Sequence, residues 1–136
     1  MKQLTGKTAF ITGASRGIGK AIAHSFAEQG ANIVFTHLSS VEQGQVTADE
    51  LKVHGVEVHA YRSDASNFSA VNDLIQKIVQ DFGRLDILVN NAGITRDNLL
   101  LRMSEQDWDE VMQVNLKSVF NTIKAVTKPM ISQRYG

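Results

Sequence analysis

Four short apolar runs alternate along the chain with longer segments in which apolar residues recur at helical spacing. β-branched or aromatic residues dominate these runs, which lie at 8–11, 33–36, 56–61 and 87–89. The segments between them, at 17–29, 41–54 and 67–82, carry the three- and four-residue spacing that predicts amphipathic helices. Strands separated by helices of this length indicate βαβ crossovers and therefore an α/β fold with a parallel sheet.

Two of the predicted helices have an apolar face and end at a glycine. The first is expected to bury Ile18, Ala21, Ile22, Ser25 and Phe26 and to end at Gly30. The third is expected to bury Val71, Leu74, Ile75, Ile78, Val79 and Phe82 and to end at Gly83. Glycine is common just past a helix because it adopts the left-handed backbone conformation without strain.

The C-terminal part reads as a helix start followed by one long amphipathic pattern. Residues Ser104 to Asp107 form a capping box, in which the serine side chain satisfies free N–H groups. The pattern continues through Trp108, Val111, Met112, Asn115, Val119, Ile123 and Val126. Pro129 is expected to kink or interrupt this helix, because proline lacks an amide hydrogen. Trp108 and Phe120 are expected to be packing residues.

Composition and charge exclude several classes of protein. The chain has no cysteine, which excludes a disulfide scaffold, a thiolate zinc site and a cysteine nucleophile. Its 14 basic and 14 acidic side chains cancel, so nothing favours a nucleic-acid partner. No stretch reaches the roughly 18 apolar residues of a membrane helix, and the start lacks a secretory core. We therefore expect a cytoplasmic protein. The four histidines are scattered and indicate no metal site.

The strongest local signal is a glycine-rich turn between the first strand and the first helix. It reads Thr12-Gly13-Ala14-Ser15-Arg16-Gly17-Ile18-Gly19. Glycines allow a tight turn and let the backbone approach a pyrophosphate, which the helix N-terminus then binds. The spacing differs from G-x-G-x-x-G, and the Lys-Ser/Thr pair of a P-loop is missing. A turn that needs glycine for geometry alone is the alternative.

The residues after the second strand favour NADP(H) over NAD(H). NAD sites place an acid there to hold the ribose 2′-hydroxyl, but this chain has no acid until Glu42. Arg16 lies in the glycine turn and can pair with a 2′-phosphate instead. Such a charge-assisted bond contributes about 1.5–3 kcal/mol, or roughly 10- to 150-fold in affinity. The alternative is that Arg16 is a solvated surface charge.

Two further motifs appear in the order that one known family shows. Asn90-Asn91-Ala92-Gly93 follows the fourth strand, and Asn115 lies at the matching distance on a later helix. With the glycine turn, they make the whole chain resemble the classical short-chain dehydrogenase/reductase family. The stretch from Asn91 to Leu100 resembles in particular the 3-oxoacyl-[acyl-carrier-protein] reductases. This resemblance implies a doubly wound, Rossmann-like sheet of strand order 3-2-1-4.

The resemblance implies a role for each matching residue. The phosphate turn would consist of Gly13, Ser15, Arg16, Gly17, Ile18 and Gly19, with Ser39 near the 2′-phosphate. The adenine edge would be read by Asp64 and Ala65, and the cofactor ribose bordered by Asn91, Ala92 and Gly93. For Asp64 the alternative is an acid that starts the next helix. For Asn90 and Asn91 it is capping of the strand end.

Asn115 is the one accessory catalytic residue that the resemblance supplies. It shares the helical stripe of Trp108, Val111, Met112 and Val119, so we expect it to be substantially buried. A buried amide without partners costs roughly 1–3 kcal/mol, so it must be hydrogen-bonded. The resemblance implies that it supports a bound water in a proton relay. A purely structural hydrogen bond is the alternative.

The chain departs from the family pattern at the catalytic acid. The family uses a tyrosine, a lysine four residues later and a serine, and none of these has a counterpart here. Neither Tyr61 nor Tyr135 is followed four residues later by lysine. We therefore interpret residues 1–136 as one NADP-binding domain, incomplete at its C-terminus after about four strands and a long helix. We expect this chain alone to be unstable as a monomer and inactive as a reductase.

The resemblance thus implies that the chain is the cofactor-binding portion of an NADPH-dependent reductase, with a 3-oxoacyl group on acyl carrier protein as its substrate. Basic residues that could contact that acidic partner are Arg96, Arg102, Lys128 and Arg134. The resemblance also implies a homotetramer, with the helix from about residue 108 to 130 at an interface. Other short-chain reductases, which act on a sugar, steroid or small alcohol, and a non-catalytic nucleotide-binding fragment are the alternatives. A methyltransferase is disfavoured by Arg16 and by the missing acid after the second strand.

Overall fold

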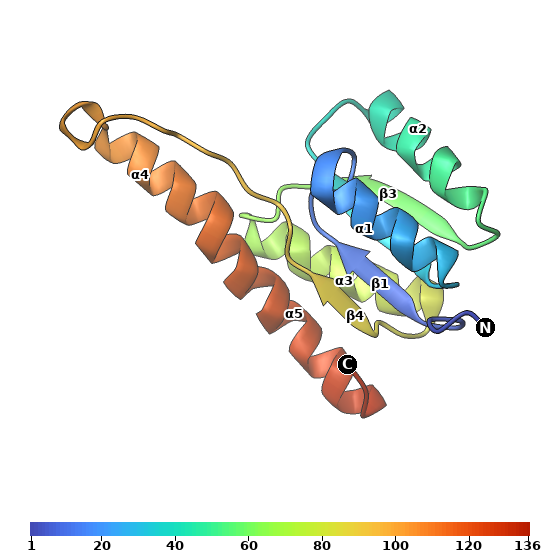
Figure 1. Cartoon of the computed structure of the whole chain (residues 1–136). Coiled ribbons are helices and arrows are strands. Elements are labelled where there is room, and N and C mark those ends of the chain that lie inside the picture. The colour runs from blue at the N-terminus through green and yellow to red at the C-terminus, as the bar shows by residue number, and fades with distance from the viewer.

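A computed structural model describes all residues 1–136 as a parallel sheet covered by helices on both faces (Figure 1). Its strands are β1 (Thr8–Ile11), β2 (Asn32–His37), β3 (Val58–Arg62) and β4 (Ile87–Val89). They lie in the order β3-β2-β1-β4, and every neighbouring pair is parallel. The predicted α/β class and the Rossmann-like strand order are confirmed. The third strand begins two residues later than the sequence indicates.

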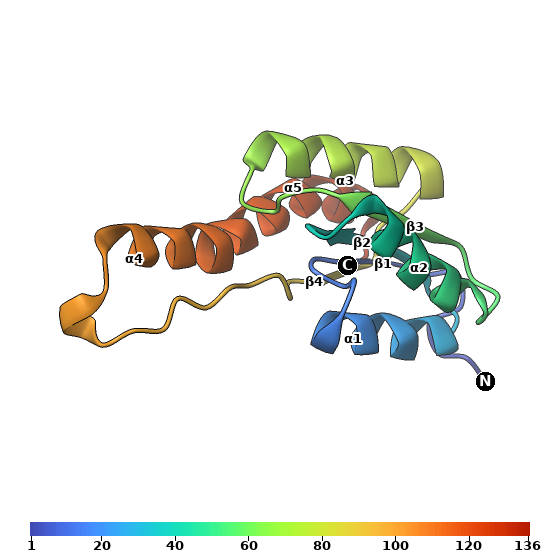
Figure 2. The ribbon, with the colours of Figure 1, turned by 90° about the horizontal axis from the view of Figure 1, so that it is seen from above.

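The helices cover the two faces of the sheet in pairs. One face packs on α1 (Gly17–Glu28) and α2 (Val41–Lys52), which bury Ala23 and Leu51 against β1 and β2. The other face packs on α3 (Phe68–Phe82) and on the C-terminal helix, as Figure 2 shows. Because both faces are covered, β1 and β2 are buried nearly throughout rather than at alternate positions.

The buried face of α3 agrees with the prediction, and that of α1 agrees in part. Helix α3 buries Val71, Leu74, Ile75 and Ile78, and Val79 and Phe82 are half-buried. In α1 the predicted Ile22 and Phe26 are half-buried against the core, but the fully buried residues are Gly19, Ala23 and Ala27, and Ile18 is 75% exposed. Small side chains let α1 approach the sheet closely, and a pattern search for bulky residues misses such a face. Gly30 and Gly83 follow their helices with φ of 91° and 74°, as expected.

A long helical arm forms the C-terminal part. A 3₁₀ turn, η1 (Leu100–Arg102), precedes α4 (Glu105–Val111), a π-helical segment η2 (Met112–Lys117) and α5 (Ser118–Gln133). The predicted capping box is present, with Ser104 Oγ accepting from Asp107 N at 3.0 Å. Helix α5 continues through Pro129, so the expected interruption is wrong.

The outer half of this arm extends away from the sheet (Figures 1 and 2). Exposed apolar side chains along the whole arm are Leu100, Leu101, Trp108, Met112, Leu116, Phe120, Ile123 and Ile131. Trp108 and Phe120, which the sequence predicts to be packing residues, are 58% and 57% exposed and so do not pack within this chain. None of the helices combines the length and the apolar character needed to span a membrane.

The histidines are less scattered than the sequence indicates. His24 on α1 and His54 after α2 lie with Nδ1 and Nε2 3.1 Å apart, and His24 Nε2 is 3.8 Å from Glu50. These residues are far apart in sequence, and only the packing of α1 on α2 brings them together. No group of histidine and acidic side chains has the arrangement of a metal site.

Candidate functional site

A cavity of about 780 Å³ lies at the carboxyl ends of the strands. Its walls come from the glycine turn after β1, from residues 36–39 at the end of β2, and from Gln43 of α2. The loops after β3 and β4 contribute residues 63–66 and 91–94. In open α/β sheets ligands bind at the carboxyl ends of the strands. They lie in the crevice at the point where the strand order reverses.

The glycines of the turn are required by close approaches and by backbone conformation. Gly13 and Gly17 have φ of 69° and 61°, which side-chain-bearing residues rarely adopt. A Cβ on Gly13 would lie 2.9 Å from Ala92 Cα. A Cβ on Gly19 would lie 2.5 Å from the Gly13 carbonyl oxygen and closer still to Asn91 Nδ2. The turn is therefore pressed against the loop after β4.

Thr12 and Asn91 join these two loops. Thr12 Oγ1 accepts hydrogen bonds from the main-chain N–H groups of Asn91 and Ala92, both at 3.0 Å. Asn91 Nδ2 donates to the carbonyl oxygens of Thr12 and Gly13 at 3.1 and 2.8 Å. The sequence motif contains both residues but does not reveal that they bind each other. These hydrogen bonds fix the positions of the two loops, and so of two cavity walls, relative to each other.

Two further threonines support the turn and were missed by the sequence analysis. Thr36 Oγ1 accepts from Gly13 N at 3.4 Å, and the Thr36 carbonyl accepts from Ala14 N at 3.1 Å. Thr47, fully buried on α2, donates to the Ser15 carbonyl oxygen at 3.0 Å. Thr47 stands 32 residues from Ser15, and no local pattern could have indicated this contact.

The residues predicted to read the adenosine come from the glycine turn and from the loops after β2 and β3. Arg16 is exposed at the N-cap of α1, and its guanidinium makes no ion pair. Ser39 Oγ is 3.0 Å from His37 Nδ1. Asp64 Oδ1 accepts from Ser66 N and Oγ at 2.9 and 2.7 Å, which leaves Oδ2 without a partner. Ala65 is buried beside it.

The structure brings most of the predicted cofactor residues to this one cavity. It is lined by Gly13, Ser15, Arg16, Gly17, Ser39, Asp64, Ala65, Asn91, Ala92 and Gly93. Ile18 and Gly19 do not line it. Gly19 lies behind the turn against Asn91, and Ile18 is exposed on α1. The individual roles of these residues remain predictions. Neither Tyr61 nor Tyr135 lines the cavity.

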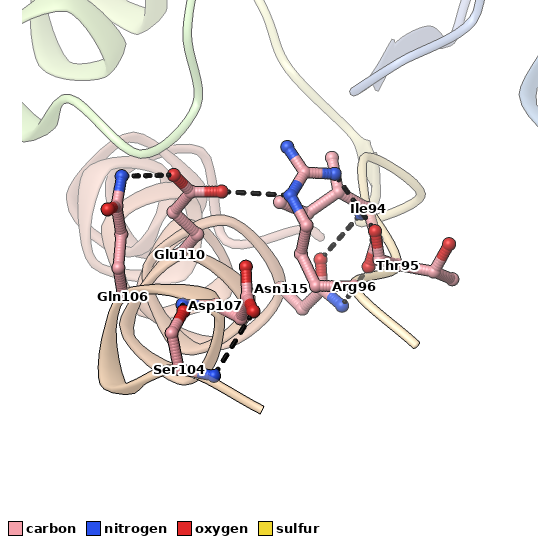
Figure 3. A network of polar contacts seen from close by, with 8 residues as sticks. All are labelled: Ile94, Thr95, Arg96, Ser104, Gln106, Asp107, Glu110 and Asn115. Carbon is pink, nitrogen blue, oxygen red and sulfur yellow. Dashed lines mark hydrogen bonds and ion pairs between the residues drawn. The ribbon is translucent and has the colours of Figure 1, made fainter. Parts of the chain in front are cut away.

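Asn115 is exposed, so the expectation that it is substantially buried is wrong. The stripe it shares with Trp108 belongs to the arm that leaves the sheet, so burial does not follow from the helical pattern. Its amide is nevertheless hydrogen-bonded. Oδ1 accepts from Ile94 N and Nδ2 donates to the Ile94 carbonyl, both at 2.8 Å (Figure 3). We call this pair of hydrogen bonds between Asn115 and Ile94 the clasp. Gly93 lies beside it, because a Cβ on Gly93 would be 3.3 Å from Asn115 Oδ1.

A second contact fixes the same segment further along the arm. Arg96 Nε donates to Glu110 Oε2 at 2.9 Å, and Gln106 Nε2 donates to Glu110 Oε1 at 3.2 Å (Figure 3). Arg96 also donates to the Thr95 carbonyl at 2.9 Å. The bond from Arg96 to Glu110 runs between the loop after β4 and the arm. The arm therefore holds one wall of the cavity although it lies outside the sheet.

Replacing Asn115 by alanine is expected to release the Ile94 segment. Two hydrogen bonds of about 0.5–1.5 kcal/mol each are lost, so amide exchange at Ile94 should accelerate by roughly five- to a hundredfold. Hydrogen–deuterium exchange read by NMR measures this directly. Asn115→Asp keeps the acceptor and loses the donor, so its exchange rate at Ile94 should lie between those of the parent protein and the alanine variant. Unchanged exchange at Ile94 in the alanine variant would contradict the clasp.

The comparison with known families identifies the class of protein. The sequence model of the short chain dehydrogenase family matches residues 7–136. With the parallel β3-β2-β1-β4 sheet and the glycine turn at its carboxyl edge, this match shows that the chain belongs to the short-chain dehydrogenase family. The family resemblance of the sequence analysis is thus confirmed.

Similar curated proteins are 3-oxoacyl-[acyl-carrier-protein] reductases named FabG. The chain is 47% identical to the one from Staphylococcus epidermidis over 130 residues, which are 96% of this chain and 53% of that protein. Identity to the Escherichia coli K12 protein is 44% over 131 residues, 96% of this chain and 52% of that protein. The chain therefore spans about half the length of the curated relatives it matches.

Solved structures of the same family share the fold. One is an NAD⁺-bound xylitol dehydrogenase, with a TM-score of 0.94 and 32% identity over 99% of this chain and 52% of that one. Another is a variant short-chain dehydrogenase/reductase from Serratia marcescens, with a TM-score of 0.88 and 35% identity. That match covers 93% of this chain and 51% of the other.

Proposed function

We propose that this chain forms the cofactor-binding part of an NADPH-dependent 3-oxoacyl-[acyl-carrier-protein] reductase. The observation that carries the proposal is the cavity whose walls are the glycine turn and the loops after β2, β3 and β4. Its close backbone approaches at Gly13 and Gly19 fit a pyrophosphate site at a helix N-terminus. Similarity to the FabG proteins supports the substrate class.

Each part of the cofactor has a group in the cavity to hold it. The N-terminus of α1, with Ser15 and Gly17, would bind the pyrophosphate, and Arg16 with Ser39 the 2′-phosphate. The free Oδ2 of Asp64 and the N–H of Ala65 would pair with the adenine edge. Residues 91–93 would border the nicotinamide ribose. Bound there, NADPH supplies a hydride to the 3-oxo carbon of the substrate.

Asn115 is proposed to hold a water in the path of the proton that the product alcohol requires. Ile94 occupies one Nδ2 hydrogen and one Oδ1 lone pair of its amide. An amide has a second hydrogen and a second lone pair, and Asn115 is exposed enough to offer them. The clasp with Ile94 then serves to fix the direction of these remaining groups.

The assembly and the protein partner are part of the same proposal. Arg102, Lys128 and Arg134 are exposed and make no ion pair, so they are available to an acidic carrier protein. Arg96 is already paired with Glu110 and is the weaker candidate. The exposed apolar side of the arm, from Trp108 to Ile123, would lie at an interface of a cytoplasmic homotetramer.

Activity is tested on the complete gene product with a 3-oxoacyl-carrier thioester. Oxidation of NADPH, followed by its absorbance, should depend on the thioester and be faster than with a sugar, a steroid or a small ketone. Preference for one of these would favour another reductase of the family. Cofactor binding without turnover of any of them would favour a non-catalytic nucleotide-binding protein.

Arg16→Ala is expected to weaken binding of NADPH by roughly 10- to 150-fold, because one charge-assisted hydrogen bond contributes about 1.5–3 kcal/mol. Affinity for NADH should change less than about twofold, since NADH lacks the 2′-phosphate. Titration by fluorescence or calorimetry gives both dissociation constants. Arg102→Ala, an exposed arginine outside the cavity, is the matched control. An equal loss of affinity for NADPH and NADH would refute the role of Arg16.

A further inference from the structure

His37 lies at the end of β2 and forms part of the cavity wall, yet no step of the proposed function uses it. Its side chain is almost fully buried, with the residue 4% exposed. Nδ1 is 3.0 Å from Ser39 Oγ. The other ring nitrogen, Nε2, faces α2 at Gly44, where any Cβ would collide with the ring. Through Nδ1, His37 contacts the Ser39 hydroxyl, which also lines the cavity.

The charges around the ring do not favour the imidazolium in the free protein. Arg62 on β3 is the register partner of His37, and Arg16 on the glycine turn lines the same cavity. The loop after β3 contributes Asp64, whose Oδ1 is occupied by Ser66. Helix α2 presents Gly44 and Gln43, which carry no charge. Burial lowers the pKa of His37, a hydrogen bond to the Ser39 main chain opposes this, and Arg62 lowers it further.

The state of the imidazole decides what Ser39 offers to a ligand. When Nδ1 is unprotonated, the Ser39 hydroxyl donates to it and presents only lone pairs to the cavity. When Nδ1 carries a proton, in the neutral Nδ1–H tautomer or in the imidazolium, Ser39 accepts that hydrogen bond and its own hydroxyl hydrogen is free to donate. An anionic phosphate requires this arrangement, and of the two forms that supply it only the imidazolium adds charge attraction to the phosphate.

We propose that His37 is a positioning residue that couples proton uptake to recognition of the 2′-phosphate through Ser39. This inference rests on the proposed function, because it assumes that the phosphate lies beside Ser39. The protein would take up a proton on Nε2 or Nδ1 of His37 when it binds NADPH but not when it binds NADH. Cofactor selectivity would then increase as the pH falls.

The sign and the useful pH window follow from linkage. Uptake of one proton makes the affinity for NADPH rise as the pH falls, by up to about tenfold per pH unit. The free 2′-phosphate itself binds a proton near pH 6, below which the net uptake disappears. The effect is therefore measurable between about pH 6.5 and pH 8.

The experiment compares dissociation constants of NADPH and NADH across this window for three proteins. In the parent protein the affinity for NADPH should fall with rising pH, while that for NADH stays nearly constant. In His37→Gln, whose side-chain amide can bond Ser39 but not titrate, the NADPH affinity should lose most of this slope. His59→Gln, at a half-exposed histidine outside the cavity, is the matched control and should keep it.

A second measurement does not depend on the variants. In protein with ¹⁵N-labelled histidine, the imidazole nitrogens of His37 should move from the neutral to the charged range on adding NADPH near pH 7, and not on adding NADH. An unchanged pH slope in His37→Gln, or a ring that stays neutral with NADPH, would overturn the inference while leaving the proposed function intact. Failure to bind either cofactor would overturn the proposed function.

Discussion

Replacing Gly19 by alanine is expected to lower the affinity for NADPH about a hundredfold. The added Cβ would meet the Gly13 carbonyl oxygen at 2.5 Å and would overlap Asn91 Nδ2. One contact is with backbone, so it cannot be relieved by a side-chain rotation alone. The turn and the loop after β4 must therefore separate, and a displacement of about 1 Å at a binding site can cost about a hundredfold. Titration with NADPH measures the loss.

The control for Gly19 is a glycine substitution outside the cavity. Gly55 has φ of 77° and open space around it, so Gly55→Ala should cost about 1 kcal/mol of stability and leave cofactor binding unchanged. Circular dichroism and thermal unfolding establish that Gly19→Ala remains folded. Normal NADPH binding by a folded Gly19→Ala protein would show that the turn is not pressed against Asn91 as described.

Replacing Asp86 by alanine is expected to destabilise the fold by about 3 kcal/mol. Asp86 precedes β4 and is buried, and its Oδ2 accepts from Thr8 N at 2.9 Å. Arg84 donates to both carboxylate oxygens, at 2.7 and 2.6 Å. Alanine leaves the buried Thr8 N–H without a partner at the join between β1 and β4. Urea unfolding measures the difference.

A surface pair provides the contrast for Asp86. Asp81 bonds Lys77 at 3.1 Å on the solvent-facing side of α3, so Asp81→Ala should lower the free energy of unfolding by less than about 1 kcal/mol. If the two variants lost similar amounts of unfolding free energy, burial would not explain the effect of Asp86.

The same carboxylate makes stability depend on acid. Burial raises the pKa of Asp86, but the hydrogen bonds from Arg84 and Thr8 outweigh it and hold the pKa below its ordinary value. Its contribution is therefore complete above the unfolded pKa of about 3.9 and is lost as the pH falls through the folded value. Below about pH 4, the free energy of unfolding should fall less steeply in Asp86→Asn than in the parent protein.

Much of the fold was predictable because its signals are local. Continuous apolar runs marked β1 and β4 to the residue, and Gly30 and Gly83 marked the ends of two helices. The glycine turn placed the cavity, because backbone conformation at Gly13 and Gly17 depends on the residues themselves. The capping box at Ser104 involves residues three apart and was found for the same reason.

The errors share a different cause. The buried face of α1 depends on how closely the sheet approaches, which Gly19, Ala23 and Ala27 permit and Ile18 would not. The exposure of Asn115 and Trp108 depends on the direction in which the arm leaves the sheet. Helical spacing says which residues share a face and cannot say what, if anything, covers it.

By itself the sequence determined the order of strands and helices, the glycine turn and the family to which they belong. Only the tertiary structure decided which side chains support that turn: Asn91 and Thr12 between two loops, Thr47 beneath Ser15, and His37 behind Ser39. Most of these partners stand tens of residues apart, and the contact of His37 with Gly44 exists only because α2 folds over β2. Local backbone preference fixes an element, whereas a hydrogen bond between elements depends on where packing places them.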